Sequence, residues 1–399
     1  MGISYLQPAE TFVRAPANGP CSPLAWLALG ATLFACGPAP IGGAAGSGGT
    51  GGSAGTAGSG GASVGPQFKP PDCEQTHSFY AHGGVGEADT TPFPIPLRPD
   101  NGGNAYQCFY FDPPYPADSQ GLWFYPDLSR ADKRFIHHMI LYGTETRKHV
   151  SGTSERCSGI QVGAYFVAGW APGSGETQFP SDVGVLLPNA ATGQYILEVH
   201  YGNPNNIADA VDSTGMQFCT ARPDARPHTA STHFTGTEAI CVPPGGEFTA
   251  QGPCDPRDDL GDIHVIGWSP HAHLLADRVT TKIMRANGSV EVMHDEPYSF
   301  NNQRPYGAPG GEIIIRAGDT IETSCHYRNP TAFEVPFGEK TQDEMCYNFV
   351  LAWPANALSI DPATLGDWER EALLGQQERR CVKPLSIFGS CNGADDMPK

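Results

Sequence analysis

The chain has 399 residues, and its 42 acidic and 24 basic side chains give a formal net charge of −18. A protein this negative repels phosphate backbones, which excludes nucleic acid as an expected partner. Only 17% of the residues are charged, while 49 are glycine and 37 are proline. This composition favours two or three domains of short strands over helical bundles. The twelve cysteines indicate disulfides and export, unless they bind metal.

The first 36 residues have the pattern of a secretory signal. Residues 23–35 form an apolar run that is shorter than the roughly 20 residues of a transmembrane helix and suits a signal peptide. The run ends in Leu33-Phe34-Ala35-Cys36, which resembles a bacterial lipobox. We therefore expect a lipoprotein of the bacterial cell envelope, which meets the membrane only through a lipid anchor at Cys36. A plain cleaved signal and a retained anchor remain alternatives.

Residues 37–66 are predicted to be a disordered tether. They contain 13 glycines, and alanine, serine and threonine fill most other positions. Such a segment cannot bury enough apolar surface to offset the entropy lost on ordering. It should behave as a flexible linker.

From residue 67 onwards the chain is predicted to be all-β. Short strand-like runs, most of them bounded by Gly, Pro, Asn or Asp, are typical of sandwiches and barrels; they cover residues 106–111, 135–142, 194–201, 279–284, 312–316 and 348–353. A polar, proline-containing stretch at 220–229 divides this part in two. We predict two β-sandwich domains, 67–222 and 223–399. The sequence has a single convincing helical pattern, which predicts a helix over 365–377.

Three histidine motifs and one methionine are candidate metal ligands. His271 and His273 form HAH, and alternate residues of a strand share a face, so both can bind one ion. His137 and His138 are adjacent. Neighbours on a regular strand face opposite sides, so this pair needs a bulge, a strand end, a strong twist or different ring nitrogens to share an ion. His200 and Met345, each taken alone, would be ordinary core residues.

In order and spacing these motifs resemble the copper type II, ascorbate-dependent monooxygenases, the family of peptidylglycine α-hydroxylating monooxygenase and dopamine β-monooxygenase. The resemblance covers roughly residues 75–355, and it extends between the motifs to segments 166–188, 212–215, 242–245, 261–273 and 317–327. It implies two jelly-roll-like β-sandwich domains, each of which holds one copper.

The resemblance also implies a role for each ligand. The first copper would be bound by His137, His138 and His200, and it would store and deliver the second electron. The second would be bound by His271, His273 and Met345, which are then the catalytic residues, since this copper would meet O2. A thioether is a soft ligand that favours Cu(I). The two sites are expected to lie apart across a solvent-filled cleft.

The implied function is hydroxylation of a C–H bond in a small organic substrate, with O2 and with ascorbate or an equivalent one-electron reductant. Ser269 stands where the peptide enzyme has an arginine for the substrate carboxylate, and Tyr347 replaces an asparagine. A glycine-extended peptide is therefore not the expected substrate. We expect a monomer. The alternatives are a non-catalytic copper-binding or copper-storing lipoprotein and, more weakly, a zinc hydrolase, for which Met345 would be a poor ligand.

Ten cysteines remain if Cys36 is lipidated and Cys21 is cleaved away. The resemblance implies three of the bridges, Cys325–Cys346, Cys108–Cys157 and Cys254–Cys381. By elimination the other four cysteines would pair as Cys219–Cys241 and Cys73–Cys391.

Two further polar residues lie close to the motifs. His264 is interpreted as a structural or supporting residue rather than a ligand. Glu198 shares a strand face with His200 and would either orient a ligand or be a solvated strand residue.

Overall fold

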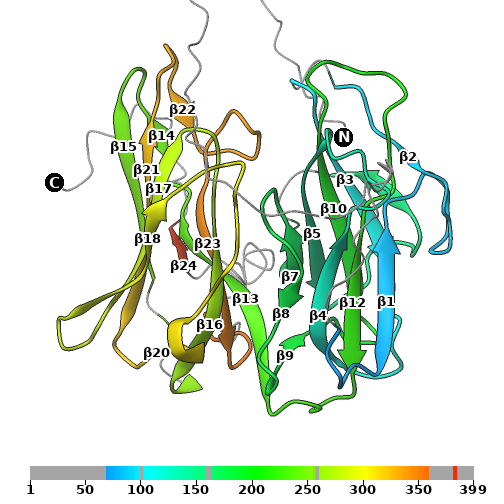
Figure 1. Ribbon diagram of the computed structural model, residues 1–399, viewed down its shortest axis with the longest axis horizontal. Helices are drawn as coiled ribbons and strands as arrows, with labels where there is room; N and C mark the ends of the chain where they lie inside the picture. Colours follow the sequence, from blue (N-terminus) through cyan, green and yellow to red (C-terminus); the bar gives the residue numbers. More distant parts are fainter. Residues whose placement is uncertain are drawn as a thin grey trace, which may run out of the picture. The chain divides into compact units, whose positions relative to one another are not determined.

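The first half of the described chain is a pair of facing sheets (Figure 1). The computed structural model describes residues 69–98, 102–157, 161, 163–254, 256 and 260–358, with the backbone of 381–383. One sheet has five strands in the order β6-β3-β10-β5-β7: β3 Asn104–Phe111, β5 Ile136–Thr144, β6 Ser154–Arg156, β7 Ala164–Trp170 and β10 Gln194–Gly202. The facing strands are β1 Gln75–Tyr80, β4 Gln120–Asp127, β8 Thr177–Gln178, β9 Val183–Leu186 and β12 Gly215–Ala221.

Apolar alternation on these strands builds the core of the first half. Leu197, Val199 and Tyr201 of β10 are fully buried in a cluster with Phe109 and Phe218 from both sheets. The residues between them point to the other face, because successive side chains of a strand alternate. That outer face carries Glu198 and His200, so the core packing fixes where the candidate ligands point.

The second half has the same two-layer plan. Four strands pair in the order β15-β21-β17-β18: β15 Glu247–Cys254, β17 Ala276–Met284, β18 Val290–Pro297 and β21 Thr320–Arg328. The other layer contains β13 His228–Thr237, β16 Ile263–Ala272, β19 Tyr306–Gly307, β20 Ile313–Ile315, β23 Cys346–Trp353 and β24 Cys381–Lys383. Its cores gather Val265, Ile283, Ile321 and Val350 in one cluster and Val279 and Tyr327 in another.

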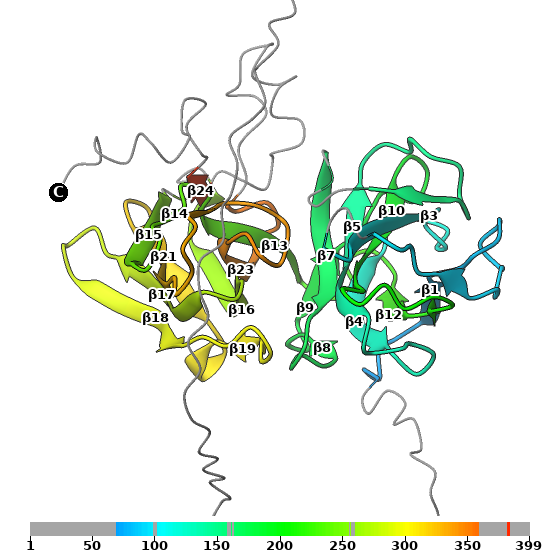
Figure 2. The ribbon, with the colours of Figure 1, turned by 90° about the horizontal axis from the view of Figure 1, so that it is seen from above.

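Strand β13 joins the two halves (Figure 2). Its first residues pair in parallel with β9, from His228 opposite Val183, and its later residues pair antiparallel with β23. One continuous sheet of eleven strands results. Every described residue lies within one compact unit, Gly61–Lys399. The domain boundary proposed at 222/223 stays a prediction.

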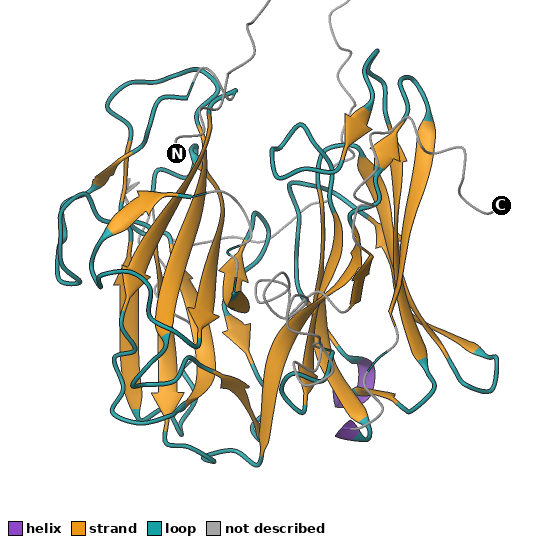
Figure 3. Ribbon diagram, turned by 180° about the vertical axis from the view of Figure 1, so that it is seen from behind, coloured by secondary structure: helices purple, strands orange, loops and turns teal. Residues whose placement is uncertain are grey.

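The prediction of an all-β chain is confirmed. Each of the six predicted runs overlaps a strand: β3, β5, β10, β17, β20 and β23. Two small ribbons pair β2 Phe93–Pro94 with β11 Val211–Asp212, and β14 Cys241–Val242 with β22 Val335–Pro336. The helical element that the structure describes in full is a 3-10 turn, η3 Pro309–Gly311 (Figure 3). No helix in this described part has the length and hydropathy needed to cross a membrane. The predicted signal, tether and helix 365–377 lie outside the described residues.

The disulfides confirm part of the predicted pairing and correct the rest. Cys325–Cys346 and Cys108–Cys157 are formed as predicted. Cys73 is bonded to Cys219, so the pairings Cys219–Cys241 and Cys73–Cys391 are wrong. The reason is local: β1 runs antiparallel beside β12, with Thr76 opposite Cys219, and this brings the start of β1 to that cysteine. Cys241 and Cys254 are also disulfide-bonded, and the pair Cys254–Cys381 stays a prediction.

Candidate metal centres

A β-bulge brings the three histidines of the first half together. His200 of β10 pairs directly with His138 of β5, whereas the next residue, Tyr201, pairs with Ile136. His137 is therefore an extra residue in β5. A bulge re-aims a side chain that would otherwise point to the opposite face. This explains how two adjacent histidines reach one place, which is one of the routes that the sequence analysis left open.

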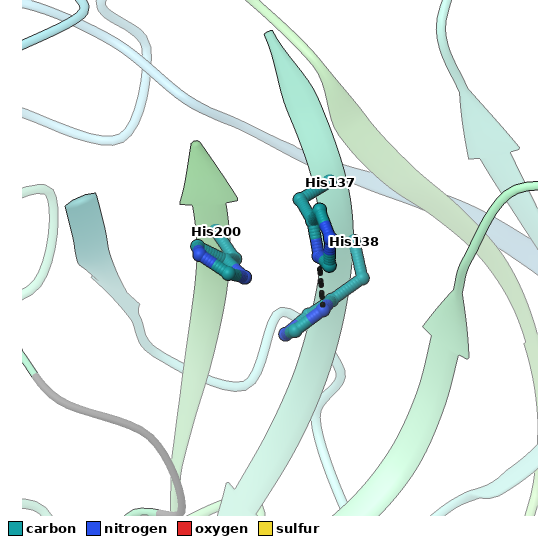
Figure 4. A group of neighbouring side chains, drawn as sticks. All are labelled: His137, His138 and His200. Atoms are coloured by element: carbon teal, nitrogen blue, oxygen red, sulfur yellow. Dashed lines mark hydrogen bonds between the residues drawn. The ribbon is translucent and has the colours of Figure 1, made fainter. Parts of the chain in front are cut away.

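The three imidazoles form a tight group (Figure 4). Their nearest ring nitrogens all lie within 4.8 Å of one another. Nδ1 of His137 lies 3.3 Å from Nδ1 of His138, and the ring centre of His200 is 4.5 Å and 4.9 Å from the other two. Burial lowers the pKa of His137 to about 4 and places the pKa values of His138 and His200 well below their usual range. The rings are thus neutral and keep a lone pair for a metal.

Hydrogen bonds decide which nitrogen holds that lone pair. Nε2 of His200 donates to Asn104 Oδ1 at 3.0 Å, while its Nδ1 is buried without a hydrogen-bond partner. The same Asn104 oxygen accepts a hydrogen bond from Thr341 Oγ1, which lies 3.5 Å from His137 Nε2. Tyr106 stacks on His200, with ring centres 4.0 Å apart. Buried polar atoms normally have partners, so the orphaned Nδ1 fits a metal ligand.

The second group forms where β16 meets the start of β23. His271 lies opposite Tyr347, and the next residue, Ala272, lies opposite Cys346. Met345 immediately precedes this pair on one strand, and His273 immediately follows it on the other. The antiparallel register therefore brings together a methionine and two histidines that are about 70 residues apart in sequence. The Cys325–Cys346 bond fixes the residue next to Met345 to β21.

Acceptors around the second group fix the tautomer of both histidines. Nδ1 of His271 donates to Gln303 Oε1 at 2.7 Å, and Nδ1 of His273 donates to the Asp343 carbonyl at 2.9 Å. Burial lowers the pKa of His271 and lowers that of His273 to about 3, so both rings are neutral. Their lone pairs therefore lie on Nε2. Oriented imidazoles of this kind are typical of metal ligands.

Glu344 anchors the turn that carries His273. Its two carboxylate oxygens accept hydrogen bonds from the backbone amides of His273, at 2.9 Å, and Leu275, at 2.6 Å. The Glu344 side chain is fully buried, and burial raises its pKa to about 7. Met345 itself is 8% exposed and packs with Phe234 and Tyr347. Both sequence neighbours of Met345 are therefore anchored, Glu344 by hydrogen bonds and Cys346 by its disulfide.

The two groups lie together, and the expected separation by a solvent-filled cleft is wrong. The ring centres of His138 and His271 are 6.2 Å apart. Phe300 lies between the groups, with its ring centre 4.8 Å from that of His137 and 6.2 Å from that of His273. His138, His271 and Met345 line one cavity of about 340 Å³. The two groups therefore share one cavity and contact the same aromatic ring, that of Phe300.

Comparison with known proteins gives this arrangement a family. Residues 96–208 match the N-terminal domain of copper type II ascorbate-dependent monooxygenases, and residues 229–361 match the C-terminal domain. Together these matches cover more than half of the chain. The chain belongs to the copper type II ascorbate-dependent monooxygenase family.

Curated relatives of this monooxygenase family are distant in sequence. DBH-like monooxygenase protein 2 of Mus musculus is 28% identical, and the match covers 62% of this chain and 43% of that protein. Tyramine beta-hydroxylase of Caenorhabditis briggsae is 25% identical, and the match covers 68% of this chain and 48% of that protein. Dopamine beta-hydroxylase of Canis lupus familiaris is 24% identical, and the match covers 60% of this chain and 42% of that protein. The chain thus spans less than half the length of these three relatives.

Of the two further polar residues near the monooxygenase motifs, Glu198 excludes one interpretation and His264 agrees with the expected one. Glu198 is 1% exposed, so the interpretation as a solvated strand residue is wrong. It accepts a hydrogen bond from Gln161 at 3.0 Å, and burial raises its pKa to about 8. It lies beside the Cys108–Cys157 bond. His264, in contrast, stacks on Trp353 and bonds to Glu312, as expected for a structural residue.

Several supporting residues were missed by sequence reasoning. Asn104, Phe300, Gln303 and Thr341 each contact a candidate ligand. They belong to loops or strand ends and form no spaced motif. Glu344 could have been identified from the sequence as a supporting residue, because it directly precedes Met345 in the monooxygenase motif.

Proposed function

We propose that the chain is a copper-dependent monooxygenase that hydroxylates a C–H bond of a small organic substrate with O2 and a one-electron reductant such as ascorbate. The observation that carries this proposal is that one imidazole of each set, His138 and His271, lines the same cavity together with Met345. Family membership supports the chemistry. The relatives named as hydroxylases share too little sequence to define the substrate.

The donor sets suit two coppers. His137 and His200 would hold one ion through their Nδ1 atoms, because their Nε2 atoms face oxygen partners, and His138 would complete the group. His271, His273 and Met345 would hold the other, and a thioether ligand favours Cu(I) over zinc. Bound copper would supply O2 activation at the second group and electron storage at the first.

The cavity wall has the character of a substrate site. The lining is mostly apolar, and its aromatic side chains include Phe166, Trp170, Phe234, Trp268, Tyr306 and Phe349. Such walls exclude water and hold an organic molecule next to Met345 and His271. Ser269 also lines the cavity and offers no cation to a substrate carboxylate. A protein that only stored copper would not need this cavity, and this favours the enzyme over the copper-storing alternative.

We also propose that the protein is a monomeric lipoprotein of the bacterial cell envelope, anchored through Cys36. The support for the anchor comes from the apolar run 23–35 and the lipobox-like residues 33–36. Labelling with a radioactive fatty acid should mark the wild-type protein and not a Cys36→Ser variant. A labelled Cys36→Ser protein would contradict the anchor.

The test of the monooxygenase is metal content and turnover. The purified chain should hold two coppers and consume O2 with ascorbate when the substrate is supplied. A metabolite extract treated with it should contain products heavier by one oxygen atom. Met345→Ala should abolish turnover and keep the three-histidine copper, whereas Met293→Ala, at a buried methionine of another core cluster, should retain turnover. Tightly bound zinc, with no oxidation of Cu(I) by O2, would contradict the proposal.

A further inference from the structure

One short segment of the second half contacts both candidate metal sites. Residues 339–345, called the strap here, connect β22 to β23 and end in Met345. The strap meets the three-histidine group at its beginning and the His-His-Met group at its end. Its contacts with the first half join residues more than 200 positions apart in sequence.

The beginning of the strap supports the three-histidine group. The Tyr106 hydroxyl, whose ring stacks on His200, donates to the Glu339 carbonyl at 2.5 Å. Thr341 Oγ1 donates to Asn104 Oδ1 at 3.0 Å and lies 3.5 Å from His137 Nε2. Because its hydrogen goes to Asn104, the threonine oxygen is free to accept from His137 Nε2–H. This leaves the lone pair of His137 on Nδ1, on the side of His138.

The end of the strap supports the His-His-Met group. The Asp343 carbonyl accepts from His273 Nδ1, and the Glu344 carboxylate accepts from the backbone amides of His273 and Leu275. Met345 follows directly and is itself a candidate ligand. Thr341, which orients one group, is therefore only four positions from Met345, which completes the other. An ion that pulls on Met345 shifts the same short backbone that positions Thr341.

We propose that the strap couples the two metal sites, with Thr341 as the positioning residue, so that filling the His-His-Met site tightens the three-histidine site. This inference rests on the proposed function, because it requires both groups to bind copper. Coupling between two sites is reciprocal and commonly amounts to a factor of 5–150 in affinity. Loss of a residue that supports a metal ligand typically lowers metal affinity by roughly 10–100-fold.

The test measures Cu(I) affinity of the whole chain by competition with a chelator. X-ray absorption identifies the His-His-Met site by its sulfur ligand. Thr341→Val removes the hydroxyl and keeps the shape, and it should weaken the three-histidine site about tenfold. Thr341→Ser restores the hydroxyl and should restore the affinity. Lys340→Ala, at an exposed side chain of the same strap, is the matched control. Near-UV circular dichroism of the metal-free proteins verifies folding.

A second arm isolates the coupling itself. Met345→Leu should lower the affinity of the three-histidine site about fivefold in the wild-type background, although it removes none of that site's ligands. The same change in the Thr341→Val background should have no further effect. The coupling would be overturned if Met345→Leu lowered the affinity of the three-histidine site equally in both backgrounds. It would also be overturned if Thr341→Val and Lys340→Ala had the same affinity at that site. If the wild-type chain binds two coppers but shows no coupling, the proposed function survives; if it binds none, both proposals fail.

Discussion

At the scale of single residues, an unpaired ring nitrogen distinguishes a candidate ligand only together with its neighbours. His200 and His233 are both 1% exposed, and Nδ1 of each is buried without a partner. Only His200 has other histidines beside it; His233 bonds to Ser231 through Nε2. The clustering of donors, and not burial alone, marks the site.

This difference gives a matched pair of variants. His200→Gln should remove one copper per chain, because two imidazoles hold the ion far less well than three. His233→Gln should keep both coppers, and any effect should be confined to stability. Inductively coupled plasma mass spectrometry after dialysis measures the number of coppers per chain in each variant. Equal copper loss in the two variants would show that the unpaired nitrogen of His200 has no metal to bind.

Asp212 is a buried carboxylate away from the metal groups, and it links stability to pH. Burial raises its pKa from 3.8 to about 6, although Tyr201 and backbone amides donate to it. The folded state therefore binds its proton more tightly than the unfolded state, and stability rises as pH falls from about 6 towards 3.8. Between pH 7 and pH 5 the gain should be about 1.4 kcal/mol.

Urea unfolding at the two pH values measures this gain. Asp212→Asn should lose it, whereas Asp209→Asn, at an exposed carboxylate, should retain the wild-type difference. Other carboxylates titrate in all three proteins, so only the difference between variants counts. An unchanged pH dependence in Asp212→Asn would mean that this carboxyl has an ordinary pKa.

At the scale of elements, the local sequence pattern predicted the strands but not the contacts between elements that are distant in sequence. Alternation and turn residues were sufficient for β3, β10 and β23, because half-buried strands carry a period of two. The bulge at His137 could be expected only as one option among several. Contacts such as Thr341 with Asn104 join residues 237 positions apart. A loop threonine and an asparagine at the start of β3 carry no periodic signal from which their contact could be predicted.

The disulfide Cys325–Cys346 braces the element that carries Met345. It closes a separation of 21 residues between β21 and β23, and loops of this size contribute about 3 kcal/mol to stability. Replacing both cysteines by alanine should cost about that much and should also weaken the His-His-Met site. Replacing Cys108 and Cys157 by alanine should lower stability and leave that site's affinity unchanged. Calorimetry and Cu(I) competition measure the two effects, and equal site affinities in both double variants would contradict the bracing role.

At the scale of the whole molecule, the two sandwiches share one sheet and one cavity. β13 carries main-chain pairing from β9 to β23, and the strap adds side-chain contacts at the metal groups. Each half has its own core, while the predicted boundary between the two halves stays a prediction. What the sequence could not provide was their closeness at the site, which depends on loops from both halves.

The net charge of −18 gives a whole-molecule prediction about the reductant. Ascorbate is an anion at neutral pH, and the described residues that line the cavity include Glu176 and Glu339 but no lysine or arginine. Like charges slow the encounter, and salt screens this repulsion as the Debye length falls from about 30 Å at 0.01 M to about 8 Å at 0.15 M. The second-order rate of copper reduction by ascorbate should therefore rise several-fold over this range.

Stopped-flow reduction of the copper-loaded chain measures that rate. Hydroquinone, which is uncharged, is the control and should reduce copper at a rate that salt leaves unchanged. Because the screening acts on the field of the whole surface, exchanging one exposed acid such as Asp209 for asparagine should alter the salt dependence only slightly. A rate for ascorbate that falls with salt would mean that a local positive patch guides the anion and outweighs the net charge of the molecule.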